Sequence, residues 1–504
     1  MAPKREDGTA CQGGIQPILV WFRRDLRLSD NPALEWAAGT GRPIIPVFIL
    51  DVETRDTALG GASRWWLHGS VDALAVALRT LGSRLVFRRG RADTVLKTLV
   101  EETGATAIAW NRIVEPAAMA RDRRIKMRFA DSGILARSFN AALLFEPWTV
   151  QTGSGMPYRV FTPFWRRCLA QGFESPGGAV TRLPPPSRWP ASDELEAWNL
   201  RCGKPDWAAG LRRTWQPGEA GARDRLDRFL NAALVGYHGG RERPGETGTS
   251  RLSPHLRFGD IGPRQVVAAI GRHAAGPGGE AFLREIGWRE FSHHLLFYNP
   301  RMESEPLRPA FKRMGWRDDP DGLAAWQRGR TGYPLVDAGM RELWTTGWMH
   351  NRVRMVAASF LTKHLLIDWR AGADWFLDTL VDADRANNSA GWQWVAGSGA
   401  DAAPYYRIFN PVAQSERFDR EGRYLRLWLP ELRRLPDRFL HAPWTAPQSV
   451  LVTAGVNLGT TTPLPIVDHA DARQRALAAW RFLRQQDLDG SELANGDGDF
   501  DRKT

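Results

Sequence analysis

Short apolar runs recur through the first 150 residues and are separated by segments with the apolar spacing of helices. These runs predict four strands and the start of a weaker fifth, at residues 18–22, 44–49, 84–87, 107–110 and 134–135. Short apolar strands that alternate with helices are typical of a parallel α/β sheet. No Gly-x-Gly-x-x-Gly motif follows any of the runs, so the sequence does not predict a dinucleotide bound in the Rossmann manner.

Two helices are predicted between these strands. Asn31 stands directly before Pro32. Asn caps the free amides of a helix and Pro is tolerated at the first helical position, so a helix is predicted to begin there. A second helix fits residues 70–81.

Beyond residue 150 the pattern changes. Residues 151–215 are punctuated by Gly, Pro and Ser and predict a long connector with one short helix over 163–170. From about residue 219 to 482 the helical period dominates and predicts a nearly all-α domain. Its clearest helical segments are 224–234, 263–272, 281–296, 336–344, 349–364 and 371–380.

These changes divide the chain into five predicted parts. They are a disordered N-terminal tail over 1–15, an α/β domain over 16–150, a connector over 151–215, a helical domain over 216–486 and an acidic, Gly-rich and Asp-rich disordered tail over 487–504.

Composition narrows the class of protein. The 504 residues carry a formal charge of +12, which suits a polyanionic partner such as a nucleic acid. They include 23 tryptophans, and indole side chains can fill a core, stack on bases or carry electrons. No run of eighteen apolar residues predicts a membrane span, and the charged N-terminus lacks the apolar core of a secretory signal, so we expect a cytoplasmic protein. The three cysteines, Cys11, Cys168 and Cys202, lack metal-ligand spacing and are expected to be free thiols.

Three polar segments of the helical domain stand out. In Gly248–Pro254, Ser253-Pro254 predicts a helix cap and first helical position beside further hydroxyls. A diphosphate would fit such a helix N-terminus, although the local sequence alone favours a capped helix without a ligand. In 346–355, helical spacing places Asn351, Arg354 and Met355 on one face.

The third polar segment, 382–394, holds two carboxylates, two amides and two indoles. A metal loop would need a third carboxylate or a His, which the segment lacks, so no metal site is predicted. Paired hydrogen bonds to a sugar or a heterocycle explain these side chains better.

Several motifs in this order resemble those of the photolyase/cryptochrome flavoprotein family, and most of all its bacterial cyclobutane pyrimidine dimer photolyases. The matching segments are WFRRDLRLSDNPAL at 21–34, GTSRLSPHLRFG at 248–259, WREF at 288–291, GWMHNRVRM at 347–355, LLIDW at 365–369, DADRANNSAGWQW at 382–394 and PYYRIFNP at 404–411. The resemblance runs from about residue 17 to 482. It implies a Rossmann-like α/β antenna domain with a parallel sheet, a long linker and an all-α C-terminal domain that binds FAD.

The resemblance also assigns residues to the cofactor. Those expected to bind FAD are Tyr237, Thr249, Ser250, Arg251, Leu252, Ser253, Phe282, Arg354, Asp382, Asp384 and Asn388. Arg354 would pair with Asp382, and Asn388 would face flavin N5. An amide there accepts a hydrogen bond from reduced flavin without supplying an acidic proton, whereas plant-type photosensors have Asp.

Further roles follow from the same resemblance. Electrons would reach the flavin through Trp316, Trp369 and Trp392, and the catalytic set adds Glu285 and Asn388. A dimer extruded from the helix would meet Glu285, Trp288, Asn351, Met355 and Trp394. Arg241 and Arg352, with the nearby Arg284, Arg289 and Lys312, would hold phosphates beside the lesion.

The resemblance implies light-driven repair of UV-damaged DNA. Reduced FAD would transfer an electron to a cyclobutane dimer, the ring would split, and the electron would return to the flavin. We expect a bacterial, cytoplasmic monomer that associates with the nucleoid through DNA. Repair of (6-4) photoproducts would require a histidine pair where Asn351 and Met355 stand. A blue-light cryptochrome without repair activity would be expected to carry Asp at 388 and often a long C-terminal extension. A structural DNA-binding protein would leave the flavin motifs unexplained.

The antenna chromophore is the one cofactor that the motifs do not decide. Ala117-Ala118 replaces the Asn-Glu pair of folate-binding relatives, which argues against methenyltetrahydrofolate. Glu115-Pro116 followed by Arg121-Asp122 is more similar to relatives that use 8-hydroxy-deazaflavin. Three alternatives therefore stay open: the folate, the deazaflavin or no antenna.

Overall fold

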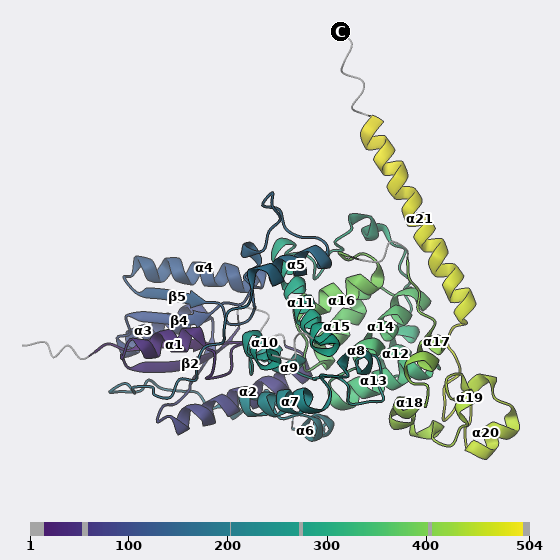
Figure 1. Cartoon of the computed structure of the whole chain (residues 1–504), viewed down its shortest axis with the longest axis horizontal. Coiled ribbons are helices and arrows are strands. Elements are labelled where there is room, and N and C mark those ends of the chain that lie inside the picture. Colours follow the sequence, from purple (N-terminus) through teal and green to yellow (C-terminus); the bar gives the residue numbers. More distant parts are fainter. Residues whose placement is uncertain (1–14, 53–58, 202, 272–275, 402–405, 497–504) are drawn as a thin grey trace, which may run out of the picture.

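The computed structural model describes residues 15–52, 59–201, 203–271, 276–401 and 406–496. A parallel sheet with its helices forms one end of the molecule, and a larger helical body forms the other (Figure 1). The predicted α/β and all-α fold classes are therefore both confirmed. The predicted N-terminal tail lies outside the described residues except for its last position, Ile15.

Five parallel strands form the sheet in the order β3-β2-β1-β4-β5. They are β1 Ile18–Phe22, β2 Ile44–Asp51, β3 Val86–Gly90, β4 Ala107–Asn111 and β5 Leu135–Phe139. Every residue of β1, β2 and β4 is buried, because helices cover both faces, and this explains the unbroken apolar runs. The third strand starts two residues later than predicted. Ser83 is still bonded to the Leu78 carbonyl at the end of the preceding helix, so pairing begins only at Val86.

The helices of this domain are α1 Pro32–Gly39, α2 Gly61–Thr80, α3 Ala92–Thr103 and α4 Pro116–Asp131. The predicted cap is confirmed, since the Leu34 amide donates to the Asn31 side chain at 3.2 Å. Helix α2 begins well before the predicted residue 70. Trp65 and Trp66 anchor its first turns in the core, and nothing in this stretch breaks a helix.

The connector carries α5 Phe161–Gln171 and α6 Ala209–Thr214. The short helix predicted over 163–170 therefore exists and is slightly longer. Glu290 fixes the segment just before the connector, because its carboxylate accepts the amides of Leu144 at 2.8 Å and Phe145 at 3.2 Å. The thiol of Cys168 is buried and free, whereas Cys11 and Cys202 lie outside the described residues.

The helical body contains α7 Glu219–Ala232, α8 Tyr237–Gly240, α9 Ser253–Phe258, α10 Pro263–Ile270, α11 Pro277–Tyr298, α12 Pro320–Gln327, α13 Pro334–Thr346, α14 Asn351–Ser359, α15 Trp369–Thr379, α16 Arg385–Ala396, α17 Pro411–Phe418, α18 Arg423–Trp428, α19 Asp437–Leu440, α20 Gln448–Ala454 and α21 His469–Gly496.

Two helices of this body differ from the sequence prediction. The helix predicted over 349–364 begins at Asn351, because the His350 ring caps it by accepting the Arg352 amide, and it changes into a π-helical turn over Phe360–His364. The first part of helix α21 packs against Pro309–Arg313 and Phe360–His364 of the body, and its C-terminal part projects beyond the body (Figure 1). It continues as far as Gly496, into the segment predicted to be a tail from residue 487, and the boundary of that tail stays a prediction. Over the part of the chain that the structure describes, no helix is both long and apolar enough to cross a membrane.

The two units interlock through buried polar groups. Arg27, which follows β1, donates to the carbonyl of Gly259 at 3.1 Å, and the indole of Trp66 donates to Asp260 at 3.2 Å. Both contacts lie just beyond α9. They hold the C-terminal end of α9 against the sheet domain, and so fix the position of the loop that precedes α9.

Candidate functional site

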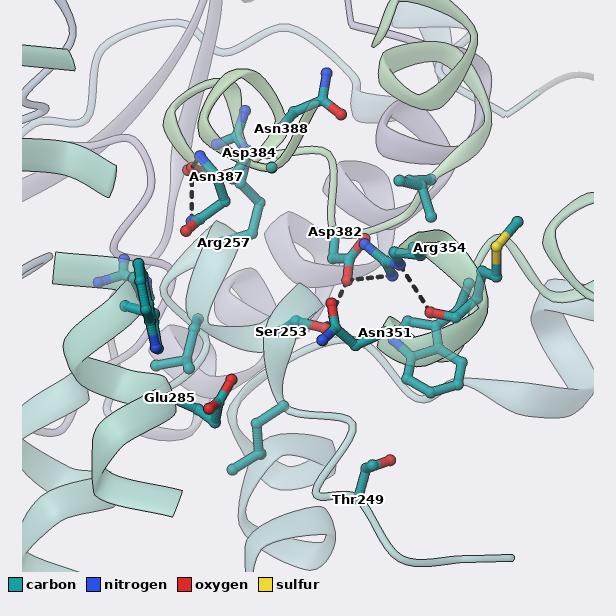
Figure 2. Close-up of a pocket in the computed structure, with 18 of the residues that line it drawn as sticks. Thr249, Ser253, Arg257, Glu285, Asn351, Arg354, Asp382, Asp384, Asn387 and Asn388 are labelled. Atoms are coloured by element: carbon teal, nitrogen blue, oxygen red, sulfur yellow. Dashed lines mark hydrogen bonds and ion pairs between the residues drawn. The ribbon is translucent and has the colours of Figure 1, made fainter. Parts of the chain in front are cut away.

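A cavity of about 390 Å³ opens between α9, α11, α14 and α16. Figure 2 shows side chains from these helices converging on it. Its lining includes all eleven residues predicted to bind the cofactor, and also Glu285, Trp288, Asn351, Met355 and Trp392. The predicted shared face of α14 is therefore confirmed, because Asn351, Arg354 and Met355 all line one cavity.

The loop before α9 forms one wall of the cavity. Arg251 has a φ of +50°, a strained backbone angle for a residue with a side chain, and its guanidinium lies 4.6 Å from the centre of the Trp348 ring. Gly248 passes so close to α8 that an added Cβ would lie 2.4 Å from the Gly240 carbonyl oxygen. The loop therefore presents Thr249, Ser250 and Arg251 to the cavity from a tightly constrained backbone.

The predicted capping role of Ser253 is wrong. Leu252 is the N-cap of α9, and its side chain makes no capping hydrogen bond. The Ser253 hydroxyl instead donates to the Asp382 carboxylate at 2.6 Å, because this buried carboxylate needs hydrogen-bond donors.

Arg354 and Asp382 form the predicted pair. The Arg354 guanidinium donates to both carboxylate oxygens, at 2.8 and 3.1 Å, and its Nε donates to the Met349 carbonyl at 2.7 Å. With Ser253, these contacts make a connected network across the cavity (Figure 2). Only 3% of the Asp382 side chain is exposed, so its charge depends on these partners.

Asp384 is the N-cap of α16. Its carboxylate accepts the backbone amide of Asn387 at 2.9 Å and the side-chain amide at 2.8 Å. Burial disfavours the charged form, but the charge of His293, whose Nε2 lies 3.5 Å away, and that of Arg257 hold the pKa of Asp384 well below its ordinary value. Asp384 therefore stays ionised and fixes the helix that carries Asn388 and Trp392.

Trp392 lies in the cavity wall over Gly372, where an added Cβ would be 2.1 Å from its ring. Its ring centre is 5.0 Å from that of Phe376 and 6.1 Å from that of Trp326. The indole nitrogen of Trp392 is buried without a hydrogen-bond partner among the described residues. Trp369 is buried at the start of α15 and Trp316 is partly buried, and the cavity lining includes neither.

Two of the residues predicted to contact the lesion, Trp288 and Glu285, lie on α11 at the rim of the cavity. Trp288 stacks on Phe161 with ring centres 3.8 Å apart, so one of its faces is already covered. Glu285 accepts a hydrogen bond from Arg241 at 2.5 Å. Burial raises the pKa of the Glu285 carboxyl, and the Arg241 charge opposes this effect.

Several predicted DNA contacts lie outside the cavity lining. Arg241, Arg352 and Trp394 do not line it, and Lys312 pairs with Glu305 at 2.7 Å on the surface. Arg289 does line it, and Arg284 lies against the Phe161 ring.

The sequence prediction missed several lining residues, namely Leu256, Arg257, Trp348, Phe376 and Asn387. The quoted family motifs contain four of these residues: Leu256, Arg257, Trp348 and Asn387. The motifs therefore pointed to these positions, although none of the four was predicted to bind the cofactor. Phe376 had no such signal, because only the fold brings α15 to the cavity.

The candidate antenna segment lies at the sheet domain. Glu115 pairs with Arg24, Arg121 donates to Asp51 at 2.7 Å, and Asp122 accepts from Arg23 at 2.9 Å. These contacts do not decide among the folate, the deazaflavin and an empty antenna site.

The cavity suits FAD on chemical grounds. The strained loop and Arg354 supply hydroxyl and guanidinium donors for a diphosphate, while Phe282, Phe376 and Trp392 supply apolar walls for rings. The unpartnered indole nitrogen of Trp392 is a further donor in the same wall.

Two family models match the chain: DNA photolyase over residues 18–187 and the FAD binding domain of DNA photolyase over residues 282–481. The deoxyribodipyrimidine photo-lyase of Agrobacterium fabrum is 51% identical over 93% of this chain and 98% of its own length. Cryptochrome-1 of Arabidopsis thaliana is 41% identical over 95% of this chain and 73% of its own length.

Solved structures agree with these matches. The crystal structure of a class III photolyase from Agrobacterium tumefaciens superposes with a TM-score of 0.91 at 50% identity, covering 95% of this chain and 100% of that one. The chain belongs to the photolyase/cryptochrome flavoprotein family and carries its FAD-binding domain.

Proposed function

We propose that this protein is a deoxyribodipyrimidine photolyase, which uses light to split cyclobutane pyrimidine dimers in UV-damaged DNA. The observation that carries the proposal is the position of Asn388 in the cavity wall. Its side-chain nitrogen donates to the Ala373 carbonyl at 3.0 Å, which leaves its oxygen as an acceptor without an acidic proton.

Different residues of the cavity would bind the cofactor and carry electrons to it. Reduced FAD, when bound and excited, supplies the electron that opens the cyclobutane ring and takes it back. Ser253, Arg354 and Asp382 would hold the cofactor through their network, and Asn388 would supply an acceptor to its N5 edge. Trp392, together with Trp369 and Trp316, would carry electrons to the cofactor when its oxidised form must be reduced.

The lesion would bind at the rim of the cavity. Glu285 has its carboxylate in the cavity wall, where it can exchange hydrogen bonds with a pyrimidine edge. Trp288 offers the face that does not contact Phe161 for stacking, and Asn351 and Met355 complete the pocket. Trp394, the remaining residue predicted to contact the lesion, lies on α16 outside the cavity lining.

Two other functions within the family are less well supported. Repair of (6-4) photoproducts needs a histidine pair, and the side chains at the two positions are an amide and a thioether, with Asn351 Nδ2 4.0 Å from Met355 Sδ. A cryptochrome is the alternative that the similarity to Cryptochrome-1 raises. Asn388 argues against it, because an Asp at this position would supply the proton that repair chemistry avoids.

We further propose that the protein acts as a monomer in the bacterial cytoplasm, where it reaches the nucleoid through DNA. The test of the main proposal has two parts. Denatured protein should release FAD in a near one-to-one ratio, and chemically reduced protein should remove dimers from irradiated DNA only in the light. Release of FMN alone, or equal loss of dimers in the dark, would contradict the proposal.

A further inference from the structure

A chain of four charged side chains crosses the rim of the cavity from α11 to α14. Glu285 on α11 accepts from Arg241, which follows α8, at 2.5 Å. The next residue, Glu242, has its Oε1 3.6 Å from Arg241 Nε. Its Oε2 accepts from Arg352 Nε at 2.7 Å, and the Nη2 atom of the same guanidinium also contacts it. The four charges sum to zero.

Among these four side chains, Glu242 alone contacts both Arg241 and Arg352, which are predicted to hold DNA phosphates. Each guanidinium is also fixed by an aromatic face: Arg352 lies 4.4 Å from the Phe418 ring centre and Arg241 lies 5.7 Å from that of Tyr237. The exposed fractions of these side chains are 19% for Arg352, 23% for Arg241 and 31% for Glu242. The carboxylate is therefore partly screened from water but still reachable from outside.

A carboxylate and a phosphate compete for the same guanidinium donors, because both are anions that accept paired N–H groups. In the free protein the carboxylate is held next to the donors by the chain itself, whereas a phosphate must be brought from solution. A phosphate that binds here must therefore displace the carboxylate or tolerate its negative charge.

We propose that Glu242 is an internal counter-ion that occupies Arg241 and Arg352 until a backbone phosphate of DNA replaces it. This role rests on the proposed function, since it assumes that the rim binds DNA. Glu242 is a positioning residue that acts through the two arginines. Its negative charge lowers the affinity for DNA with or without a lesion, and it limits the number of phosphates that the rim holds.

The test is Glu242→Gln, which keeps the shape and an acceptor oxygen but removes the charge. At low salt we expect its affinity for a short duplex, intact or carrying one cyclobutane dimer, to rise about three- to tenfold. We also expect log K to fall more steeply with log salt, by about 0.9 for one additional phosphate contact. The flavin spectrum should be unchanged, because Glu242 does not line the cavity.

Glu246→Gln is the matched control. It makes the same change of charge in the same loop, but Glu246 pairs with Arg243 at 3.1 Å on the exposed surface. We expect its affinity for DNA to change less than twofold. In an Arg352→Ala background the effect of Glu242→Gln should also shrink, because one of its two partners is missing.

Weaker binding by Glu242→Gln, unchanged binding, or an equal gain with Glu246→Gln would each overturn the role of Glu242. If the parent protein binds and repairs irradiated DNA while one of these results is found, only this inference fails. If the parent neither binds nor repairs such DNA, the proposed function fails with it.

Discussion

The side-chain nitrogen of Asn388 donates to the backbone carbonyl of Ala373 at 3.0 Å, and this bond leaves the amide oxygen available as an acceptor. Ala373 lies in α15 and Asn388 in α16, and the two helices pack closely. The oxygen is therefore presented as an acceptor by a rigid pair of helices, without a titratable proton.

Replacing this amide by an acid should change the flavin chemistry. We expect Asn388→Asp to favour the protonated form of the one-electron-reduced flavin during illumination and to depress dimer repair, because the new carboxyl supplies a proton at N5. Absorption spectra during photoreduction and repair assays measure the two effects. Asn388→Ala, which removes the amide without adding an acid, should not favour the protonated form. An Asp variant with parental spectra and activity would contradict this role.

Retention of FAD should depend on Asp382. Asp382→Asn removes the charge that balances Arg354 in a nearly buried site, so we expect FAD to bind about ten- to a hundredfold more weakly. Fluorescence of FAD released on dilution measures the change. Asp374→Asn removes an exposed carboxylate from α15 and should retain FAD like the parent. Equal retention by both variants would mean that the Arg354 pair does not hold the cofactor.

Trp392→Phe should separate photoreduction from repair. We expect slower light-driven reduction of oxidised FAD but nearly normal repair by enzyme that was reduced chemically, because repair needs no outside electron once the flavin is reduced. Trp369→Phe should behave in the same way. Trp326→Phe is the informative comparison, since Trp326 contacts Trp392 but also donates to the Ala357 carbonyl at 2.9 Å as a core residue. If Trp326→Phe alone slowed photoreduction, the electron path would run through Trp326.

Glu342 should make stability depend on pH. Burial raises its pKa to about 7, although the Tyr424 hydroxyl donates to it at 2.7 Å. The unfolded chain has the ordinary value of 4.5, so the folded protein binds a proton more tightly between these values. The stabilisation is complete below pH 4.5 and is lost as pH rises through 7.

Glu342→Gln keeps an acceptor for Tyr424 and removes the titration. From pH 4.5 to 8 the parent should therefore lose on the order of 3 kcal/mol of stability relative to Glu342→Gln. Thermal melts across this range measure the difference, with Glu246→Gln as an exposed control. Parallel melting curves of the parent and Glu342→Gln at all pH values would contradict the assignment.

Local patterns in the sequence predicted much of this fold. Strands buried on both faces leave continuous apolar runs, and Asn31-Pro32 carries its own capping chemistry, so both could be identified without tertiary information. The shared face of Asn351 and Met355 follows from helical geometry alone. These features depend on residues within a few positions of one another.

Other features depend on partners far along the chain. Ser253 looked like a cap because its best partner, Asp382, is 129 positions away. The pairing of Glu242 with Arg352 spans 110 positions, and neither residue type nor spacing indicates it. The contact of Trp326 with Trp392 likewise needs the packing of α12 against α16.

Repair of a single defined lesion distinguishes a cyclobutane dimer photolyase from the other members of the family. Reduced protein is mixed with an oligonucleotide that carries one defined lesion, either a cyclobutane thymine dimer or a (6-4) photoproduct, and the products are separated by chromatography after blue or near-UV light and after darkness. The cyclobutane dimer should return to two thymines only in the light, and the (6-4) product should remain. Loss of the dimer in the dark, repair of the (6-4) product, or no repair by fully reduced protein would contradict the assignment as a cyclobutane dimer photolyase.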